Sequence, residues 1–292
     1  MRPRNVMLHS FIRRLHGGRL VSYVNMTVPS RCAQRQVRVP LLGGIGFDNL
    51  YAGEAWMAAI LAVILPHRAG AFVDVGVNVG QTLLKVKVLN PEQPYIGFEP
   101  NPVCYNYTRR LIAENGFASC TLLPVGLSNT ATVAPLFINA DADVGGTTIP
   151  GFREPHQWTQ VRHVAVFPGD AMLATLDSPP VSVIKIDVEG AELEVLEGLR
   201  QTLETRPFIL CEILPLFTDG CAKGRFRRPR QDRLLANMRE AGYELFRVLA
   251  DASVVPLHDI ETHEDPSLSN YLLAPHEERA FVDATLVRTT PV

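Results

Sequence analysis

Short apolar runs alternate with helical segments along most of this chain, and this alternation limits the folds it can adopt. Runs such as Ala71–Val75 and Val181–Ile186 have the length and composition of buried strands. Segments between them, for example Gln81–Leu89, have the length of helices. Strands that alternate with helices form a parallel sheet covered on both faces. The sequence therefore predicts an α/β fold with a doubly wound sheet of about seven strands, most of them parallel.

The predicted elements and domains follow from the same pattern. Strands are expected at Leu20–Val24, Gln36–Leu42, Ala71–Val75, Tyr95–Phe98, Thr121–Val125, Val181–Ile186, Phe208–Ile213, Tyr243–Val248 and Tyr271–Ala274. Helices are expected at Glu54–Leu65, Gln81–Leu89, Val103–Glu114, Ala191–Thr205 and Gln231–Ala241. The weakly patterned segment Asn139–Pro168 is expected to be a long loop that covers or selects a substrate. We expect an N-terminal extension, residues 1–66, that packs on a domain of residues 67–292.

Composition and charge limit the kinds of molecule that this chain is expected to bind and the compartment that suits it. The formal net charge of −2 over 292 residues gives no electrostatic reason to expect nucleic acid. No apolar run approaches the roughly 20 residues of a membrane-spanning helix. The five cysteines include no Cys-x-x-Cys pair, so neither a zinc site nor a disulfide framework is expected. A reducing compartment, the cytoplasm, fits this usage best.

The first 47 residues carry a local bias in charge. They contain eight arginines and no Asp or Glu, and the first acid is Asp48. Such a stretch fits either an organelle-targeting peptide or a basic segment that folds against the domain. The alternation of QVRVPL, residues 36–41, is typical of a strand and favours the second interpretation.

A strand–turn–helix corner at Phe72–Gln81, with the sequence FVDVGVNVGQ, is the first candidate ligand site. Gly76 and Gly80 frame the turn, where small residues let a ligand approach the backbone and the helix N-terminus presents free N–H groups. The spacing lacks the Gly-x-Gly-x-x-Gly fingerprint of dinucleotide sites. S-adenosylmethionine, in contrast, has no phosphate for the turn to bind. Asp74 is suited to accept hydrogen bonds from the ammonium of its methionine part, directly or through water, and Asn78 is expected to hold the same part. An ordinary packed corner is the alternative.

The segment Tyr95–Asn101, YIGFEPN, is the second candidate. Glu99 ends a predicted strand 19 residues after Gly80, the separation at which an acid typically accepts hydrogen bonds from ribose hydroxyls. A carboxylate suits this role because its two oxygens can accept from two adjacent hydroxyls. Asn101 and Pro102 are expected to cap and start the next helix. A surface acid at a strand end is the alternative for Glu99.

Polar residues lie in and directly after the apolar run Val181–Ile186, within the sequence VIKIDVEGAE. Burial of a charge without a partner is costly, so Lys185, Asp187 and Glu189 either pair with one another or face a ligand. The two acids end the strand expected beside Ala71–Val75, where a methyl group and its acceptor would meet. Glu212, at the end of FILCEI, is expected in the same cleft. A structural ion pair, with acids favoured by the helix dipole, is the alternative.

Together these segments resemble the FkbM-type methyltransferases. That family has an Asp-x-Gly-x-Asn-x-Gly turn, a Phe-Glu-Pro-Asn segment and a Lys-Ile-Asp-Val-Glu-Gly-x-Glu signature. The matching segments here are Asp74–Gly80, Phe98–Asn101 and Lys185–Glu192. Gly126–Asn129 (GLSN) also matches, at the position where adenine contacts are expected. The resemblance covers about residues 72–213. It implies the Rossmann-like fold of class I methyltransferases, S-adenosylmethionine as cofactor, and methylation of a hydroxyl on a sugar, glycoconjugate or secondary metabolite.

The site residues follow from the motifs and the resemblance. The expected cofactor-binding residues are Asp74, Gly76, Asn78, Gly80, Gln81, Glu99, Pro100, Asn101, Gly126, Leu127 and Ser128. Of the expected catalytic residues, Glu189 is favoured as general base and Asp187 as a positioning group, with Glu212 near both. A divalent cation between these carboxylates is opposed by the charge of Lys185, so no metal is expected.

Rival functions stay open. One is a non-catalytic module that keeps the nucleoside pocket. Another is a nicotinamide-dependent oxidoreductase, against which the missing dinucleotide fingerprint counts. A nucleic-acid methyltransferase is disfavoured by the net charge and because Val-Glu-Gly, and not Pro-Pro and an aromatic residue, follows Asp187. The sequence gives no signal for the acceptor molecule or the oligomeric state.

Overall fold

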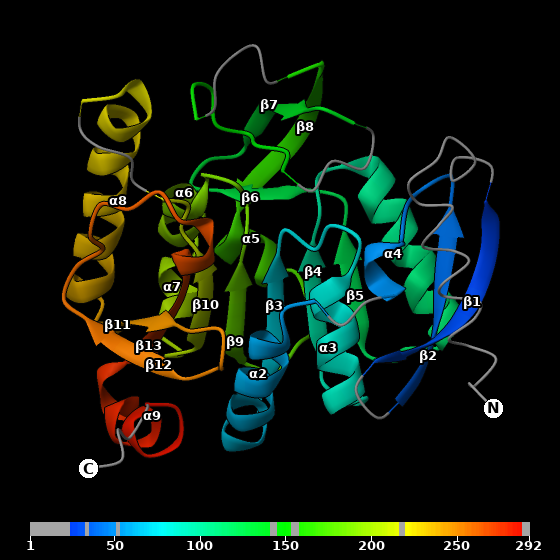
Figure 1. The fold of residues 1–292 in the computed structure, drawn as a ribbon, viewed down its shortest axis with the longest axis horizontal. Helices are drawn as coiled ribbons and strands as arrows, with labels where there is room; N and C mark the ends of the chain where they lie inside the picture. Colours follow the sequence, from blue (N-terminus) through cyan, green and yellow to red (C-terminus); the bar gives the residue numbers. More distant parts are fainter. Residues whose placement is uncertain are drawn as a thin grey trace.

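The computed structural model describes residues 24–32, 35–50, 53–140, 145–152, 158–215 and 220–287. A sheet of eight strands crosses its centre in the order β12-β11-β13-β10-β9-β3-β4-β5 (Figure 1). The parallel strands are β3 (Ala71–Val75), β4 (Tyr95–Phe98), β5 (Cys120–Leu123), β9 (Val181–Ile186) and β10 (Phe208–Glu212). Antiparallel pairing adds β11 (Tyr243–Val248), β12 (Val254–Leu257) and β13 (Asn270–Pro275). The predicted Rossmann-like α/β fold is confirmed.

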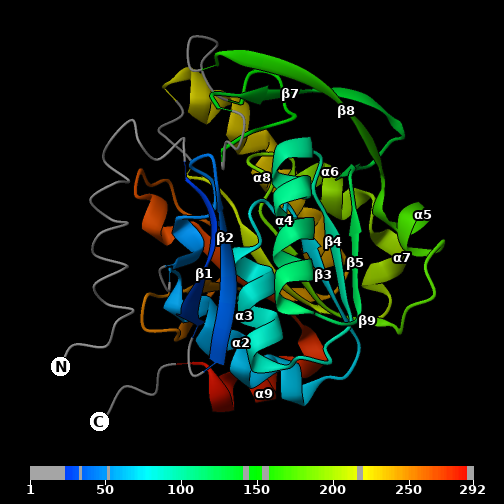
Figure 2. The same ribbon diagram turned by 90° about the vertical axis from the view of Figure 1, so that its right-hand side faces the viewer.

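Helices cover both faces of this sheet (Figure 2). One face carries α2 (Ala55–His67), α3 (Gln81–Leu89), α4 (Pro102–Asn115) and α9 (Arg279–Thr285). The other carries α5 (Gly169–Leu173), α6 (Glu192–Glu197), α7 (Arg200–Leu203) and α8 (Ala222–Glu240). Because successive strand residues point to opposite faces, Phe72 of β3 packs in one apolar cluster and Val73 in the other.

A hairpin of β1 (Asn25–Cys32) and β2 (Arg35–Leu42) packs on α4, and the short helix η2 (Asp48–Leu50) follows it. The amide Nδ2 of Asn115 donates to the Arg38 carbonyl at 2.8 Å, and the Tyr107 hydroxyl donates to the Pro40 carbonyl at 2.9 Å. Of the strand predicted at 20–24, only Val24 lies within the described residues, and β1 starts directly after it. The division into residues 1–66 and 67–292 stays a prediction.

A three-stranded sheet lies beyond the carboxyl ends of β3, β4 and β9 (Figure 1). We call it the roof sheet; it consists of β6 (Gly126–Ser128), β7 (Thr132–Ile138) and β8 (Gln160–Pro168). The long loop predicted for residues 139–168 is therefore wrong in its last nine residues, which form β8. That strand is stabilised by its antiparallel pairing with β7, across a connection of more than 20 residues, which a local pattern does not reveal.

Two predicted helices differ in their extent. The helix expected at 191–205 is divided into α6 and α7 around Gly198, where a Cβ atom would lie 2.0 Å from the Ser128 carbonyl oxygen. The helix expected from Gln231 starts nine residues earlier, at Ala222, where mostly charged residues obscure the apolar period. Among the described residues, no helix combines the length and apolar character that a membrane span requires. No described cysteine forms a disulfide.

Candidate active site

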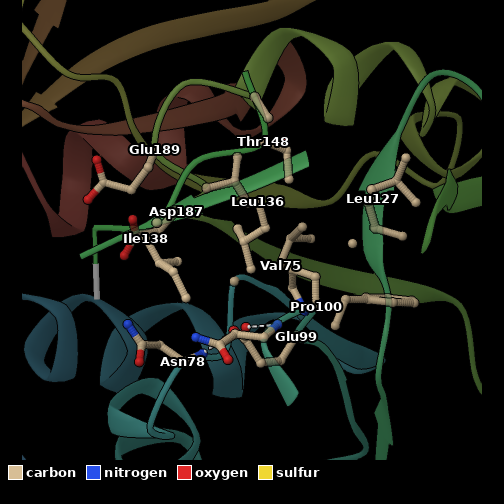
Figure 3. Close-up of a pocket in the computed structure, with 18 residues that line it drawn as sticks. Val75, Asn78, Glu99, Pro100, Leu127, Leu136, Ile138, Thr148, Asp187 and Glu189 are labelled. Carbon is tan, nitrogen blue, oxygen red and sulfur yellow. Dashed lines mark hydrogen bonds between the residues drawn. The ribbon is translucent and has the colours of Figure 1, made fainter. Parts of the chain in front are cut away.

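A cavity that opens to solvent, with a volume of about 680 Å³ when the adjoining solvent space is included, lies between the carboxyl ends of the central strands and the roof sheet (Figure 3). Its walls come from β3, β4 and β9, from the turns that follow them, and from β6, β7 and β8. The residues that line it are Val75, Gly76, Asn78, Phe98, Glu99, Pro100, Asn101, Gly126, Leu127, Leu136, Ile138, Gly146, Thr148, Val166, Asp187, Val188, Glu189 and Ala191. Its lining, mostly apolar with a few polar groups, is typical of a small-molecule site.

The turn between β3 and α3 brings the backbone close to the end of β9. A Cβ atom on Gly76, whose φ is +86°, would lie 1.9 Å from the Asp187 carbonyl oxygen. The Asp187 N–H donates to the Val75 carbonyl at 3.0 Å and fixes this approach. Asn78 also has a left-handed backbone, with φ 51°, and its carbonyl accepts from the Thr108 hydroxyl at 2.7 Å. The corner therefore requires a glycine where the two strands meet.

Glu99 is buried at the end of β4 and connects the two neighbouring turns. Its Oε2 accepts from the Asn78 N–H and its Oε1 from the Asn101 N–H, each at 2.7 Å. Burial raises the pKa of Glu99 to about 7, although these hydrogen bonds favour the ionised form. Each oxygen can accept a further hydrogen bond from a ligand in the cavity.

Asp74 lies beneath the cavity and does not line it. The carboxylate is fully buried; its Oδ2 accepts from the Tyr95 hydroxyl at 2.5 Å, and its Oδ1 lies 3.6 Å from the Lys185 ammonium. Lys185 also donates to the Gly76 carbonyl at 3.1 Å and to Asp187 Oδ2 at 3.2 Å. Asp74 thus positions Lys185. The Lys185 ammonium in turn connects the turn after β3, through the Gly76 carbonyl, to the end of β9, through Asp187.

The turn after β9 presents two carboxylates to the cavity. Figure 3 shows Asp187 and Glu189 together at one end and Leu127 at the other. Glu189 has a left-handed backbone, with φ 54°. The next residue, Gly190, donates its N–H to Glu192 Oε1 at 2.8 Å. Burial raises the pKa of Glu192 to about 7. Because Asp187 and Glu189 lie at one end and Leu127 at the other, the cavity is acidic at one end and apolar at the other.

Glu212, at the end of β10, lines a second, smaller cavity that Asp187 also lines. The pKa of Glu212 is raised to about 9, first by burial and then by the negative charges of Asp187 and Glu189. Near neutral pH this carboxyl group therefore holds a proton, which suits it to donate a hydrogen bond.

The structure brings most of the sequence-predicted site residues together. Those that line the main cavity are Gly76, Asn78, Glu99, Pro100, Asn101, Gly126, Leu127, Asp187 and Glu189. Those that do not line it are Asp74, Gly80, Gln81, Ser128 and Glu212. Gly80 instead caps α3 with a φ of 78°, and a Cβ there would lie 2.9 Å from Leu111. The binding and catalytic roles of all these residues stay predictions.

Sequence reasoning missed the contribution of the roof sheet. Leu136 and Ile138 of β7, Val166 of β8 and Thr148 also line the cavity. The alternation of Leu136 and Ile138 with more exposed neighbours is a signal that could have been used. Thr148 carries no comparable signal.

A family model for the methyltransferase FkbM domain matches residues 74–245, which is more than half of the chain. The chain belongs to the FkbM methyltransferase family. The matched region contains the main cavity's polar wall, from the Asp74–Gly80 turn through Glu99 to Asp187 and Glu189. The predicted family membership is therefore confirmed, and this FkbM domain places the family's segments around one cavity.

Two curated relatives match part of this chain. Methyltransferase sdnD of Sordaria araneosa is 31% identical over 153 residues, which cover 44% of this chain and 59% of that protein. Hexuronic acid methyltransferase AglP of Haloferax volcanii is 29% identical over 150 residues, which cover 48% of this chain and 54% of that protein. The alignments thus span less than two thirds of either relative. A solved SAM-dependent O-methyltransferase from Thermotoga maritima shares 9% identity and a TM-score of 0.40, covering 91% of this chain and 79% of its own.

Proposed function

We propose that this FkbM-family protein transfers a methyl group from S-adenosylmethionine to a hydroxyl oxygen of a small molecule or glycan. The observation that carries the proposal is the main cavity, with Glu99 on one wall, Asp187 and Glu189 at one end, and Leu127 at the other. A relative named for a hexuronic acid supports a sugar-like acceptor. The cytoplasmic location expected from the cysteines and the absence of a nucleic-acid partner are part of this proposal.

The residues present fit such a cofactor. Gly76 lines the cavity, and its lack of a side chain lets the turn after β3 lie close to the end of β9. The Glu99 carboxylate offers acceptor oxygens suited to the two ribose hydroxyls. Leu127 and Val166 give an apolar surface suited to adenine. Asn78 and Asp187 lie at the polar end, suited to the amino-acid part. The adenine end and the methionine end thus have distinct surroundings.

When bound, the cofactor supplies an electrophilic methyl group. The protein's own residues must align the acceptor oxygen, exclude water and take up the hydroxyl proton. We assign the proton to Glu189, which lines the cavity beside Asp187. Asp187, held by Lys185 at 3.2 Å, positions the acceptor. Glu212, with its raised pKa, donates a hydrogen bond to it.

Calorimetry with S-adenosylhomocysteine tests the binding half of this proposal. We expect saturable binding of the nucleoside and none of NAD, and we expect Glu99→Ala to weaken that binding about tenfold or more, because the ribose loses its acceptor. Glu92→Ala, an exposed acid on the loop before β4, is the matched control. Binding of NAD alone, or equal affinity in both variants, would overturn the proposal.

The catalytic half is tested with methyl-labelled donor and small-molecule extract. Wild-type protein should label an acceptor, and Glu189→Gln should lower the rate about a hundredfold, as expected for loss of a general base, while it keeps nucleoside affinity. Full affinity without labelled product in any extract would support a non-catalytic binding module.

A further inference from the structure

The helix α8 contacts the turn after β9 from outside the main cavity. It packs on α6, the helix that follows this turn (Figure 1). On α8, the Arg230 guanidinium donates through Nη2 to the Gly190 carbonyl at 2.9 Å and to Glu194 Oε2 at 2.5 Å. Arg230 does not line the main cavity and lies outside the segments that resemble the family's motifs. The proposed methyl transfer assigns it no role.

Gly190 is held at three places. Its N–H donates to Glu192 Oε1 at 2.8 Å, and its carbonyl accepts from Arg230. The ring of Phe152 covers its Cα atom: a Cβ on Gly190, whose φ is +108°, would lie 2.4 Å from that ring. The peptide group that follows Glu189 and the one that follows Gly190 are therefore both fixed.

A second arginine of α8 holds Phe152. The Arg227 Cζ atom lies 4.2 Å from the centroid of the Phe152 ring, and the guanidinium donates to the Phe152 carbonyl at 3.3 Å. The same guanidinium donates to the Pro215 carbonyl, after β10, at 2.9 Å. Phe152 belongs to residues 145–152, the segment that also contributes Thr148 to the wall of the main cavity. The helix α8 thus contacts the turn after β9 directly and through Phe152.

The turn requires this support because its backbone conformation is unfavourable. Glu189 has a φ of 54°, in the left-handed region that a non-glycine residue adopts only where its surroundings hold it. If the turn relaxed to another conformation, the direction of the Glu189 side chain would change. A general base must stay within hydrogen-bond reach of the proton that it removes, and a displacement of about 1 Å can cost about a hundredfold in rate.

We propose that Arg230 is a positioning residue for methyl transfer: by holding the Gly190 carbonyl, it keeps the Glu189 carboxylate directed at the acceptor hydroxyl. The inference rests on the proposed function, in which Glu189 takes up the hydroxyl proton. Arg230 acts through the backbone of the turn. It should therefore affect the rate of the chemical step and not the binding of the donor, whose expected contacts lie on Asn78 and Glu99.

The chain offers a matched control on the same face of α8. The Arg233 guanidinium lies 2.6 Å from Glu197 Oε1, so it also links α8 to α6 by an ion pair. Of the two arginines, Arg230 is the one that also donates to the turn. Arg230→Met and Arg233→Met thus each remove one ion pair between the helices, but only Arg230→Met removes the hydrogen bond to Gly190.

The test measures initial rates of label transfer to the small-molecule extract while the concentration of methyl-labelled S-adenosylmethionine is varied. We expect Arg230→Met to lower the apparent kcat about tenfold or more. Its KM for the donor and its affinity for S-adenosylhomocysteine should stay within about twofold of the wild-type values. Arg233→Met should keep the wild-type kcat. An unchanged kcat in Arg230→Met, equal losses in the two variants, or a parallel loss of nucleoside affinity in Arg230→Met would overturn the inference.

Hydrogen exchange gives a second readout that needs no acceptor. The amide hydrogen of Gly190 should exchange at least about tenfold faster in Arg230→Met than in the wild-type protein, and at the wild-type rate in Arg233→Met. Exchange that is equal in all three proteins also contradicts the role given to Arg230. If the wild-type protein binds no S-adenosylhomocysteine or labels no acceptor, the proposed function fails instead, so the two failures are distinguishable.

Discussion

The carboxyl group of Glu99 links protonation to ligand binding. With its pKa raised from 4.5 to about 7 by burial, it is partly protonated at neutral pH in the free protein. Ribose hydroxyls bind best to the ionised form, which has more acceptor capacity. For the fold the sign is opposite, because the stabilising contribution of this group is complete below pH 4.5 and is lost as the pH rises through 7.

We therefore expect nucleoside affinity to be constant above pH 7 and to fall by up to about tenfold per pH unit below it. Calorimetry with S-adenosylhomocysteine between pH 5.5 and 8.5 measures this dependence. Glu99→Gln should bind more weakly at high pH and show a flat profile, whereas the exposed Glu92→Gln should keep the wild-type profile. A flat profile in the wild-type protein would contradict the role given to Glu99.

The sequence predicts individual site residues unevenly. Glu99, Asp187 and Glu189 are recognisable because charged side chains at the ends of apolar strands need a partner or a ligand. Asp74 shows the limit of that argument. Its buried carboxylate accepts a hydrogen bond from the hydroxyl of Tyr95, 21 residues away, and pairs with the ammonium of Lys185, more than a hundred residues away. The sequence indicates that such a residue needs a partner, but it does not identify a partner that is distant in the chain.

Among elements, the junction of β3 and β9 depends on one glycine. Gly76→Ala combines a left-handed backbone with a Cβ atom 1.9 Å from the Asp187 carbonyl oxygen, so β9 would have to move. Gly116→Ala is the matched control, since it has a φ of +60° at the end of α4 but no atom within 4 Å of the added Cβ.

We expect Gly116→Ala to lower the free energy of unfolding by about 1–2 kcal/mol, the cost of the left-handed backbone alone. Gly76→Ala should lower it by at least about 3 kcal/mol, because steric overlap adds to that strain. Urea denaturation of both variants measures the difference. Equal losses would mean that the two strand ends are less tightly coupled than the structure indicates.

The helices and strands that are most deeply buried are the ones that the sequence predicts best. β3, β4 and β9 have the bounds expected from sequence, since strands buried on both faces consist almost entirely of apolar residues. β12 and β8 were missed because they are half-exposed, and their residues resemble those of loops. α8 was recognised only in its second half, because Pro229 and many arginines interrupt its period.

For the whole molecule, the main cavity joins the central sheet to the roof sheet. A ligand held there contacts segments from β3 to β9 and both layers that enclose it. It binds only the folded state, so S-adenosylhomocysteine at a hundred times its dissociation constant should stabilise the protein by about 2.7 kcal/mol.

Thermal unfolding with and without the nucleoside measures this effect, and hydrogen exchange locates it. Protection should rise in the turn after β3, in the turn after β9 and in β7, which line the cavity. The hairpin of β1 and β2 lines neither cavity and serves as an internal control. Protection confined to β3, with none in β7, would show that the roof sheet does not contact the ligand.

The two edge strands of the central sheet are short. β5 and β12 have four residues each, and β12 contains Pro256, which has no N–H to donate. Short edges and edge prolines prevent a further chain from extending a sheet. Self-association by extension of the central sheet is therefore disfavoured at both edges.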